Sequence, residues 1–215
     1  RPPNLLFTIM KSLNHKAFLF FILLFFVLTN VSINAQVIET SVSSTTELNY
    51  SGDVSNSDLL AGITPTISGP AWSSNVIQLT DGIHGGTFAT SGIQGAWTTV
   101  NATATYDLGT GANGTGYDLN SIVSIAAWES AGYGNQGWTI EVQPVGGSFT
   151  TLDTGNCQPF GTSDAGTTKV IKGDGSTILA SGIQYIRITA NSVTSSNNSF
   201  VWRELDVFGV FNSDP

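Results

Sequence analysis

Cysteine, histidine and positive charge are all scarce in this chain of 215 residues. The single Cys157 excludes a scaffold of disulfides and is expected to be buried or inert. Seven Lys and Arg stand against 15 Asp and Glu, and nucleic-acid binding is not expected because phosphate contacts need clustered cations. Charged residues make up 10% and five Trp are present, which excludes disorder, since disordered chains are rich in charge and poor in aromatics. The composition predicts one compact, acidic globular domain.

The N-terminal segment has the layout of a targeting sequence. Two lysines precede the apolar run 17–28, and a polar stretch that ends at Ala35 follows it. The layout is typical of a secretory signal peptide, and the run is too short for a bilayer span, which takes roughly 20 residues. We predict upstream translation over 1–9, a signal peptide over 10–35 and a secreted or cell-surface chain that begins near Gln36 and has no stable membrane span. The alternative is an N-terminal anchor helix.

After the leader, apolar and polar residues alternate in short runs separated by Gly, Asn, Ser and Asp. A repeat of two residues that puts the apolar side chains on one face is typical of antiparallel strands with one face exposed to solvent. We expect strands over 37–43, 98–108, 122–128, 138–142, 149–152, 168–171, 185–190 and 205–211. A single helical turn is expected at 56–61, with Ser57 as its cap. The fold class is all-β, an antiparallel two-sheet sandwich.

The domain organisation is simple. We assign 36–52 to an N-terminal strand or lead-in and 53–211 to one sandwich domain. The last residues, 212–215, look like the start of a linker or a truncated end, so further domains are expected downstream.

Two glycine-rich segments match the dinucleotide fingerprint G-x-G-x-x-G, at 109–114 and at 132–137. That chemistry requires a helix N-terminus directly afterwards to hold the pyrophosphate. A strand pattern follows the second segment, and more Gly and Asp follow the first. Both are interpreted as turns. The one histidine after the leader, His84, lies in a Gly-rich loop with no nucleophile elbow near it, so a catalytic triad is not indicated.

Two pairs of acids are candidates for a hydrolytic site, namely Glu204 with Asp206, and Glu129 with Glu141, which flank the Gly-rich loop. Glu204 and Asp206 are two residues apart on an expected strand and share a face. A glycosidase needs two carboxyl groups across a cleft, one of them with a raised pKa. Nothing in the sequence indicates a cleft, so both are expected to be solvated strand carboxylates.

Three ordered sets of residues carry a family resemblance. They are Leu-Thr-Asp-Gly at 79–82 with Thr87, Ala-Thr-Tyr-Asp-Leu-Gly at 104–109 with 122–125, and Tyr-Ile-Arg-Ile at 185–188 with Arg-Glu-Leu-Asp-Val-Phe-Gly at 203–209. Together with the hairpin that starts at 138–142, they resemble the galactose-binding-like jelly-roll family. This family includes discoidin or coagulation-factor type C domains and many carbohydrate-binding modules. The resemblance covers roughly 53–210 and is greatest to secreted bacterial members. It implies a jelly-roll sandwich.

The resemblance also implies a structural calcium ion beside the Asp-Gly loop. Carried over to this chain, its ligands are Asp81, Thr87 and Glu204. The chain departs from the pattern because Ile83 and His84 follow the Asp-Gly pair in place of a second acid, which removes one anionic ligand. The alternative is that Asp81 only caps a turn by accepting backbone N–H groups.

Family members bind ligands through loops at one end of the sandwich. Sugar recognition places an aromatic ring against the apolar face of a pyranose, with amides and carboxylates bonding its hydroxyls. The residues that match this chemistry are Tyr133, Glu129, Asn135 and Gln136 in one Gly-rich loop, and Trp72 and Trp97 in other Gly/Ser-rich segments. The polar loop 191–199 is a third rim candidate.

Three functions therefore compete. The first is a secreted, non-catalytic carbohydrate-binding or adhesion module whose partner is a glycan or polysaccharide. The second is a structural extracellular matrix or surface protein that makes only protein contacts. A glycoside hydrolase is the least favoured of the three.

Overall fold

The computed structural model of the chain describes residues 35–42, 55–70, 76–83, 96–128, 132–158, 165–173 and 178–212. The expected upstream segment, nearly all of the signal peptide and residues 213–215 lie outside these ranges. None of the described residues forms a helix that is long and apolar enough to cross a membrane.

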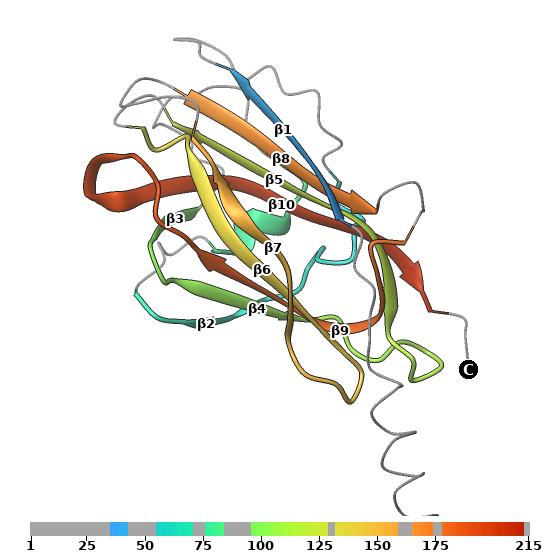
Figure 1. Cartoon of the computed structure of the whole chain (residues 1–215). Coiled ribbons are helices and arrows are strands. Elements are labelled where there is room, and N and C mark those ends of the chain that lie inside the picture. The colour runs from blue at the N-terminus through green and yellow to red at the C-terminus, as the bar shows by residue number, and fades with distance from the viewer. Residues whose placement is uncertain are drawn as a thin grey trace, which may run out of the picture. The chain divides into compact units, whose positions relative to one another are not determined.

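Ten strands and two short 3-10 turns make up the regular structure of the described chain (Figure 1). The strands are β1 (Ala35–Val42), β2 (Thr66–Ser68), β3 (Ala96–Thr99), β4 (Thr103–Asp107), β5 (Tyr117–Trp128), β6 (Gln136–Pro144), β7 (Thr150–Cys157), β8 (Ala165–Gly173), β9 (Ala180–Ala190) and β10 (Ser199–Phe211). The 3-10 turns are η1 (Val76–Thr80) and η2 (Ser196–Asn198).

The strands form two layers, and every pair is antiparallel. One layer has the order β1-β8-β5-β10-β3 and the other has the order β2-β4-β9-β6-β7. The two layers are joined where the start of β5 pairs with β9, through Tyr117↔Ile183 and Leu119↔Ala180. The predicted all-β, antiparallel two-sheet sandwich is confirmed (Figure 1).

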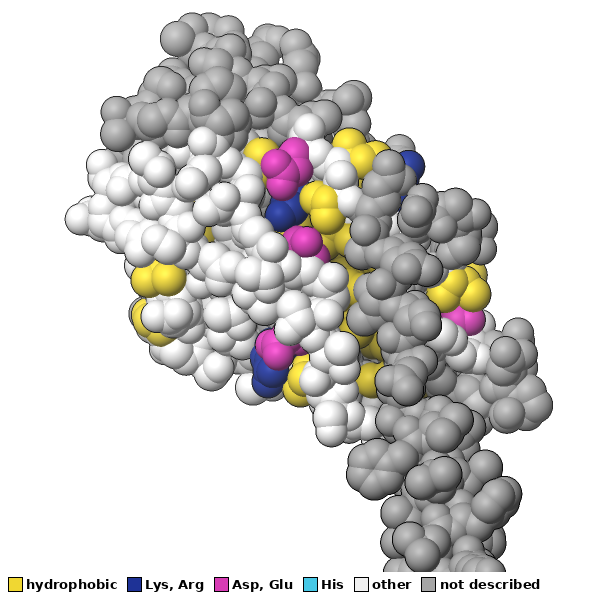
Figure 2. All heavy atoms as spheres, in the orientation of Figure 1, with side chains coloured by type: hydrophobic (Ala, Val, Ile, Leu, Met, Phe, Trp, Pro, Cys, Tyr) yellow, Lys and Arg dark blue, Asp and Glu magenta, His cyan; other side chains and the backbone are white. Residues whose placement is uncertain are grey.

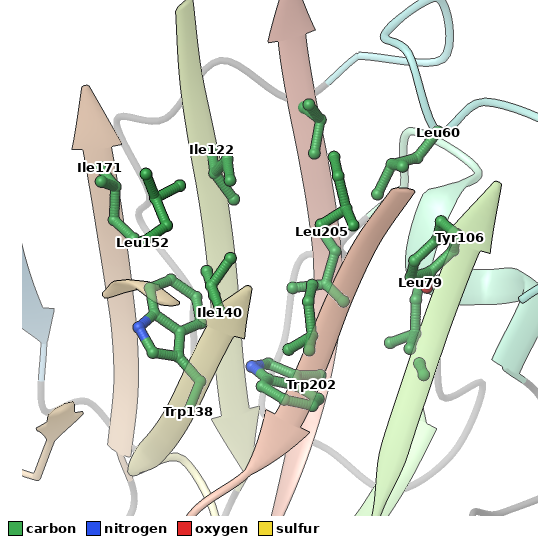
Figure 3. Packing of buried hydrophobic residues seen from close by; sticks show 14 of the residues in the cluster. Leu60, Leu79, Tyr106, Ile122, Trp138, Ile140, Leu152, Ile171, Trp202 and Leu205 are labelled. Atoms are coloured by element: carbon green, nitrogen blue, oxygen red, sulfur yellow. The ribbon is translucent and has the colours of Figure 1, made fainter. Parts of the chain in front are cut away.

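The apolar faces of the alternating strands fill the space between the layers. On β6, Trp138, Ile140 and Val142 are buried while Thr139 and Glu141 are partly exposed. Trp138 and Trp202 are both fully buried and are the two largest side chains of the core (Figure 3). Aromatic side chains dominate core energetics because each buries a large apolar area.

Cys157 lies at the end of β7 and is buried as a free thiol. Burial and the nearby Glu39 carboxylate raise the pKa of this thiol to about 11. The thiolate is the reactive form of cysteine, so the raised pKa disfavours reaction, and the expected burial of this thiol is confirmed.

The structure differs from the predicted elements at two places. The alternating run 98–108 is two strands, because Asn101 adopts a left-handed backbone (φ 67°) and turns the chain between β3 and β4. The expected helical turn at 56–61 is a pair of tight turns, and its cap is Asp58, whose Oδ1 accepts from Leu60 N at 2.7 Å. Ser57 does not fill that role.

The face of the molecule shown in Figure 2 carries few charged side chains. On the outer face of the second sheet, threonines from neighbouring strands form pairs, such as Thr103 with Thr189 at 3.1 Å between hydroxyl oxygens. Arg187 donates to both carboxylate oxygens of Glu141, at 2.6 and 2.7 Å. This face is polar, and the charges of Arg187 and Glu141 on it are paired.

Candidate ligand-binding site

Several connections between strands meet at one end of the sandwich. The strand register brings the end of β5 beside the start of β8, and the start of β6 beside the end of β7. It also places the end of β9 beside β6. The described parts of these connections are 132–135, Gln158 and 191–198. The loops that carry the predicted rim residues are therefore neighbours in space.

Tyr133 lies in a tight turn at this end and is half-buried. The turn is closed by a hydrogen bond from Asn135 N to Gly132 O at 3.0 Å, and Gly132 has a positive φ of 73° that favours glycine. The carbonyl of Tyr133 accepts from Val201 N at 2.9 Å, which ties the turn to β10. The residue is thus partly accessible, and its backbone is fixed.

The two amides next to Tyr133 do not line a rim, and this part of the prediction is wrong. Asn135 and Gln136 are both fully buried. Asn135 Nδ2 donates to Thr194 O at 2.8 Å. These amides serve contacts within the domain and are not available to ligand hydroxyls. The Gly-rich composition indicated an exposed loop, but the chain enters β6 at Gln136, one residue after the turn ends.

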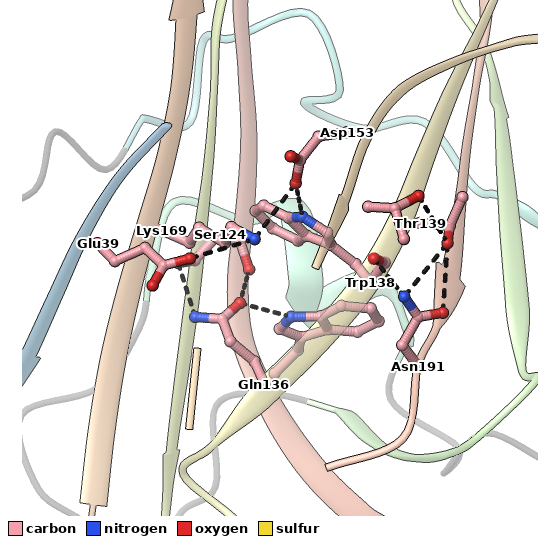
Figure 4. A network of polar contacts seen from close by, with 10 residues as sticks. Glu39, Ser124, Gln136, Trp138, Thr139, Asp153, Lys169 and Asn191 are labelled. Carbon is pink, nitrogen blue, oxygen red and sulfur yellow. Dashed lines mark hydrogen bonds and ion pairs between the residues drawn. The ribbon is translucent and has the colours of Figure 1, made fainter. Parts of the chain in front are cut away.

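Gln136 is the centre of a buried polar network beneath the loop end (Figure 4). Its Nε2 donates to Thr167 O and Thr167 Oγ1, both at 3.0 Å, and to Ser124 O at 3.2 Å. Its Oε1 accepts from Ser124 Oγ and from Trp202 Nε1. Gln136 therefore bonds strands of both layers at the base of the loops.

The loop between β9 and β10 is also held in one shape. Asn198 has a left-handed backbone (φ 52°), and its Oδ1 accepts from Ser192 Oγ at 3.0 Å and Val193 N at 2.9 Å. Thr194 N donates to Oε1 of the exposed Gln158 at 2.8 Å, which joins this loop to the end of β7. Ser192, Thr194, Ser196 and Asn197 are exposed.

Gln158 is a rim residue that sequence analysis missed. It follows Cys157 as a single amide, and no alternation or motif distinguishes it from other polar residues. Only the pairing of β6 with β7 shows that it reaches the loop 191–198.

The remaining predicted ligand contacts cannot be placed. Glu129 and Trp72 lie outside the described residues. Trp97 is in β3 opposite Val201, but its side chain is not among those described. These three stay predictions.

The predicted metal ligands lie at the Asp-Gly turn after η1. Asp81 Oδ1 accepts from Ile83 N at 3.0 Å, so Asp81 does cap the turn. The two oxygens of Glu204 accept from Gly82 N at 3.1 Å and Ile83 N at 3.2 Å. Thr87 lies outside the described residues. Among the residues that are described, no three His, Cys, Asp or Glu side chains form a group able to hold a metal ion.

Glu204 and Asp206 are not solvated, contrary to the prediction, because both side chains are fully buried. Burial, together with the Asp206 and Asp81 charges, raises the pKa of Glu204 to about 9, although the two backbone N–H groups lower it in part. Burial and the Asp58 charge raise the pKa of Asp206 to about 7. Neither oxygen of Asp206 has a partner in normal hydrogen-bond geometry. Interactions with the Ser55 backbone and the Glu204 side chain lower the pKa of Asp206 and offset part of its rise.

These two acids resemble a glycosidase pair only in their pKa values. A hydrolytic pair must reach a substrate across a cleft, and neither side chain is accessible. The turn at 55–60 covers this part of β10, where Leu59 N donates to Val207 O at 2.8 Å. Asp58 Oδ1 accepts from Val207 N at 3.1 Å in the same place.

No family model matches the chain, and no curated protein matches it. Among solved structures, it is similar to the family 32 carbohydrate-binding module of Clostridium perfringens NanJ in complex with galactose, with 13% identity over 79% of this chain and 98% of that chain and a TM-score of 0.45. A second family 32 module from C. perfringens, in complex with GalNAc-β-1,3-galactose, has 18% identity over 80% and 94%, with a TM-score of 0.39. The family 32 module of AlyQ, in complex with 4,5-unsaturated mannuronic acid, has 18% identity over 66% and 93%, with a TM-score of 0.40.

Proposed function

We propose that this protein is a secreted, non-catalytic module that binds a glycan at the loop end of the sandwich. The observation that carries the proposal is the half-buried residue Tyr133, whose backbone is fixed to β10. An aromatic ring held in place loses little conformational freedom when a sugar stacks on it. The neighbouring loop 191–198 adds exposed hydroxyls and an amide, and Gln158 adds another.

The chemistry of the described part of this rim suits a neutral sugar. Residues 132–135, Gln158 and 191–198 contain no charged side chain. Sugar hydroxyls both donate and accept, as do the hydroxyls and amides of the rim. Stacking on one ring gains only a few kcal/mol, so we expect monosaccharide affinity to be weak, roughly millimolar. Firm attachment would then depend on repeated ligand units or linked modules.

The test is a titration of the mature chain and of Tyr133→Ala on a panel of polysaccharides that includes galactose, N-acetylgalactosamine and mannuronate polymers. We expect Tyr133→Ala to weaken binding at least tenfold, which is about 1.4 kcal/mol, because the stacking surface is lost. Tyr133→Phe keeps the ring and should bind nearly as tightly as the wild type.

Tyr185→Ala is the matched control, because Tyr185 is a half-buried tyrosine on the outer sheet face, within 6.4 Å of the Phe149 ring centre. It should leave binding unchanged. Equal binding by wild type and Tyr133→Ala would exclude this loop and make Trp72 and Trp97 the next positions to test. Glu129→Gln tests the acid that the sequence places beside the ring.

We further propose a calcium ion beside the Asp-Gly turn. Hard cations take six to eight oxygen ligands, so Asp81, Glu204 and Thr87 would act together with backbone carbonyls. The buried oxygens of Asp206 and the Oδ2 of Asp58 lack hydrogen-bond partners among the described residues, and a nearby cation would satisfy them, but the described residues alone do not complete a metal site. When bound, the ion would supply positive charge to a group of buried carboxylates.

Calcium is therefore expected to raise the melting temperature. An ion that binds only the folded state at a hundredfold excess over its Kd adds about 2.7 kcal/mol, or roughly 5–10 °C for a domain of this size. The measurement is a melt with calcium chloride, with magnesium chloride and with a chelator. Identical midpoints would remove calcium and leave Asp81 as a turn residue.

A further inference from the structure

Lys169 is a buried lysine with no place in the proposed binding site. It lies in the middle of β8, and its side chain is 3% exposed. The only other lysine after the leader, Lys172, is on the same strand and is exposed. Burying an ammonium group is unfavourable unless it is closely paired, so Lys169 is expected to have acidic partners close by.

Two carboxyl groups from other strands converge on this amine (Figure 4). The Nζ lies 3.2 Å from Oδ2 of Asp153 in β7 and 3.4 Å from Oε1 of Glu39 in β1. The Asp153 side chain is 14% exposed, whereas that of Glu39 is 42% exposed. One acid is therefore enclosed with the amine, and the other is open to water.

Two further residues fix this arrangement. The Trp138 ring lies beside Nζ, 5.0 Å from nitrogen to ring centre, and Trp138 Nε1 donates to the same Oδ2 of Asp153 at 2.6 Å. A Cβ added to Gly155 would lie 3.1 Å from Nζ, so the glycine leaves the room that the lysine occupies. Asp153 and Lys169 are held in contact by the two sheets and by an indole.

These groups are the components of amide formation. An amine in contact with a carboxyl group, out of bulk water, reacts as if at very high concentration because its orientation is already fixed. The indole N–H polarises the carboxyl group, and a second carboxyl group in contact with the amine can take and return its proton. Surface ion pairs, in contrast, are mobile and solvated.

We propose that Lys169 and Asp153 condense to form an isopeptide bond, with Glu39 as the proton carrier. Glu39 takes a proton from the ammonium group, and the free amine attacks Cγ of Asp153. The C–N bond forms, and two protons, the one held by Glu39 and one released by the attacking nitrogen, pass to the departing Asp153 oxygen, which leaves as water when the C–O bond breaks. The ammonium loses two hydrogens and the carboxylate one oxygen, which leave as one water molecule. No other reactant is consumed.

The isopeptide bond would join the two sheets at a place where no backbone hydrogen bonds connect them. β7 is the edge of one layer and β8 lies in the other, and no backbone pairing connects them. The reaction replaces two buried charges by one neutral amide, which removes their desolvation cost. It also closes the chain between residues 153 and 169 covalently, which limits the unfolded state. A secreted module would gain resistance to unfolding without a disulfide.

The test is the intact mass of the denatured mature chain. We expect the wild type to be lighter than its sequence by the mass of one water molecule. A chymotryptic digest, which cleaves after Phe160 and so separates the two residues, should contain one peptide with Asp153 joined to one with Lys169. A wild-type mass equal to the sequence, with no joined peptide, would overturn the proposal and leave an ion pair.

Variants separate the bond from its proton carrier. Lys169→Arg keeps the charge but cannot form the amide, and it should show the full mass of its sequence. Lys172→Arg, on the exposed position of the same strand, should lose one water molecule like the wild type. Glu39→Gln, at a partly exposed position, should stay unlinked while folded by circular dichroism. Complete linkage in folded Glu39→Gln would overturn the role of Glu39.

Discussion

Asp206→Asn is expected to stabilise the protein at pH 8 and to flatten the dependence of its stability on pH. In the wild type, the pKa of Asp206 rises on folding from 3.8 to about 7, chiefly through burial. A raised pKa means that the folded state binds a proton that the unfolded state has released. The favourable contribution of this group is therefore complete below about pH 4 and is lost as the pH rises through 7.

The expected size follows from the shift. Each pKa unit corresponds to about 1.4 kcal/mol, so the wild type should lose about 4 kcal/mol of unfolding free energy between pH 4 and pH 8 through this group. Because Asp206 also raises the pKa of Glu204, its removal relieves both acids. We expect Asp206→Asn to recover about 3 kcal/mol at pH 8, or roughly 6–12 °C in the melting temperature.

Chemical denaturation at pH 5 and pH 8 in the presence of a chelator measures this effect in the absence of calcium, with Asp107→Asn as the control. Asp107 is exposed and caps a turn through Gly109 N at 2.9 Å, a bond that asparagine can also make. The control makes the same change of charge and should alter stability little at either pH. The buried-acid interpretation would be contradicted if the wild type were more stable at pH 8 than at pH 5 and if Asp206→Asn were less stable than the wild type at pH 8.

Gln136→Leu is expected to destabilise the protein by about 3–5 kcal/mol. The substitution keeps the volume of the side chain but removes the amide that bonds several buried groups, among them Ser124 Oγ, Thr167 O and Trp202 Nε1. Each unsatisfied buried polar group costs about 1–3 kcal/mol. A network that is only partly satisfied is worse than an apolar core, so the losses should not be recovered by repacking.

The measurement is the free energy of unfolding from urea titrations, with Gln143→Leu as the control. Gln143 is on the same strand, but it is partly exposed and makes one side-chain bond, to Gly147 O. It should change stability by no more than about 0.5 kcal/mol. Equal effects of the two substitutions would show that the buried network does not hold the base of the loops.

Much of the fold could be predicted because the alternation of apolar and polar residues depends only on which way neighbouring side chains point along a strand. Trp138, Ile140 and Val142 must face one way on any strand that contains them, so their burial follows from the sequence. The error at 98–108 has an equally local cause. Asn101 is a residue that tolerates a left-handed backbone, and the alternation continues through the turn that it makes.

The wrong predictions of exposure at the candidate site have a different cause. The local sequence pattern does not indicate that a segment far away in the sequence will bury a residue. Asp206 alternates as a solvated residue would, yet the turn at 55–60, far away in the sequence, covers it. Gln136 follows a Gly-rich stretch and looks like a loop amide, yet Ser124 and Thr167 from two other strands enclose it. Tyr133 lies in a fixed turn beside this buried amide, and its contact with a ligand stays a prediction.

The most direct test of glycan binding at this end is a map of backbone amide shifts in the labelled mature protein, recorded during titration with the best polysaccharide fragment from the panel. The proposal predicts that the changes cluster at 132–134, at Gln158 and across 192–198. Changes centred on the outer sheet face, around Glu141 and Arg187, would contradict it, and so would saturated binding with no change at these loops.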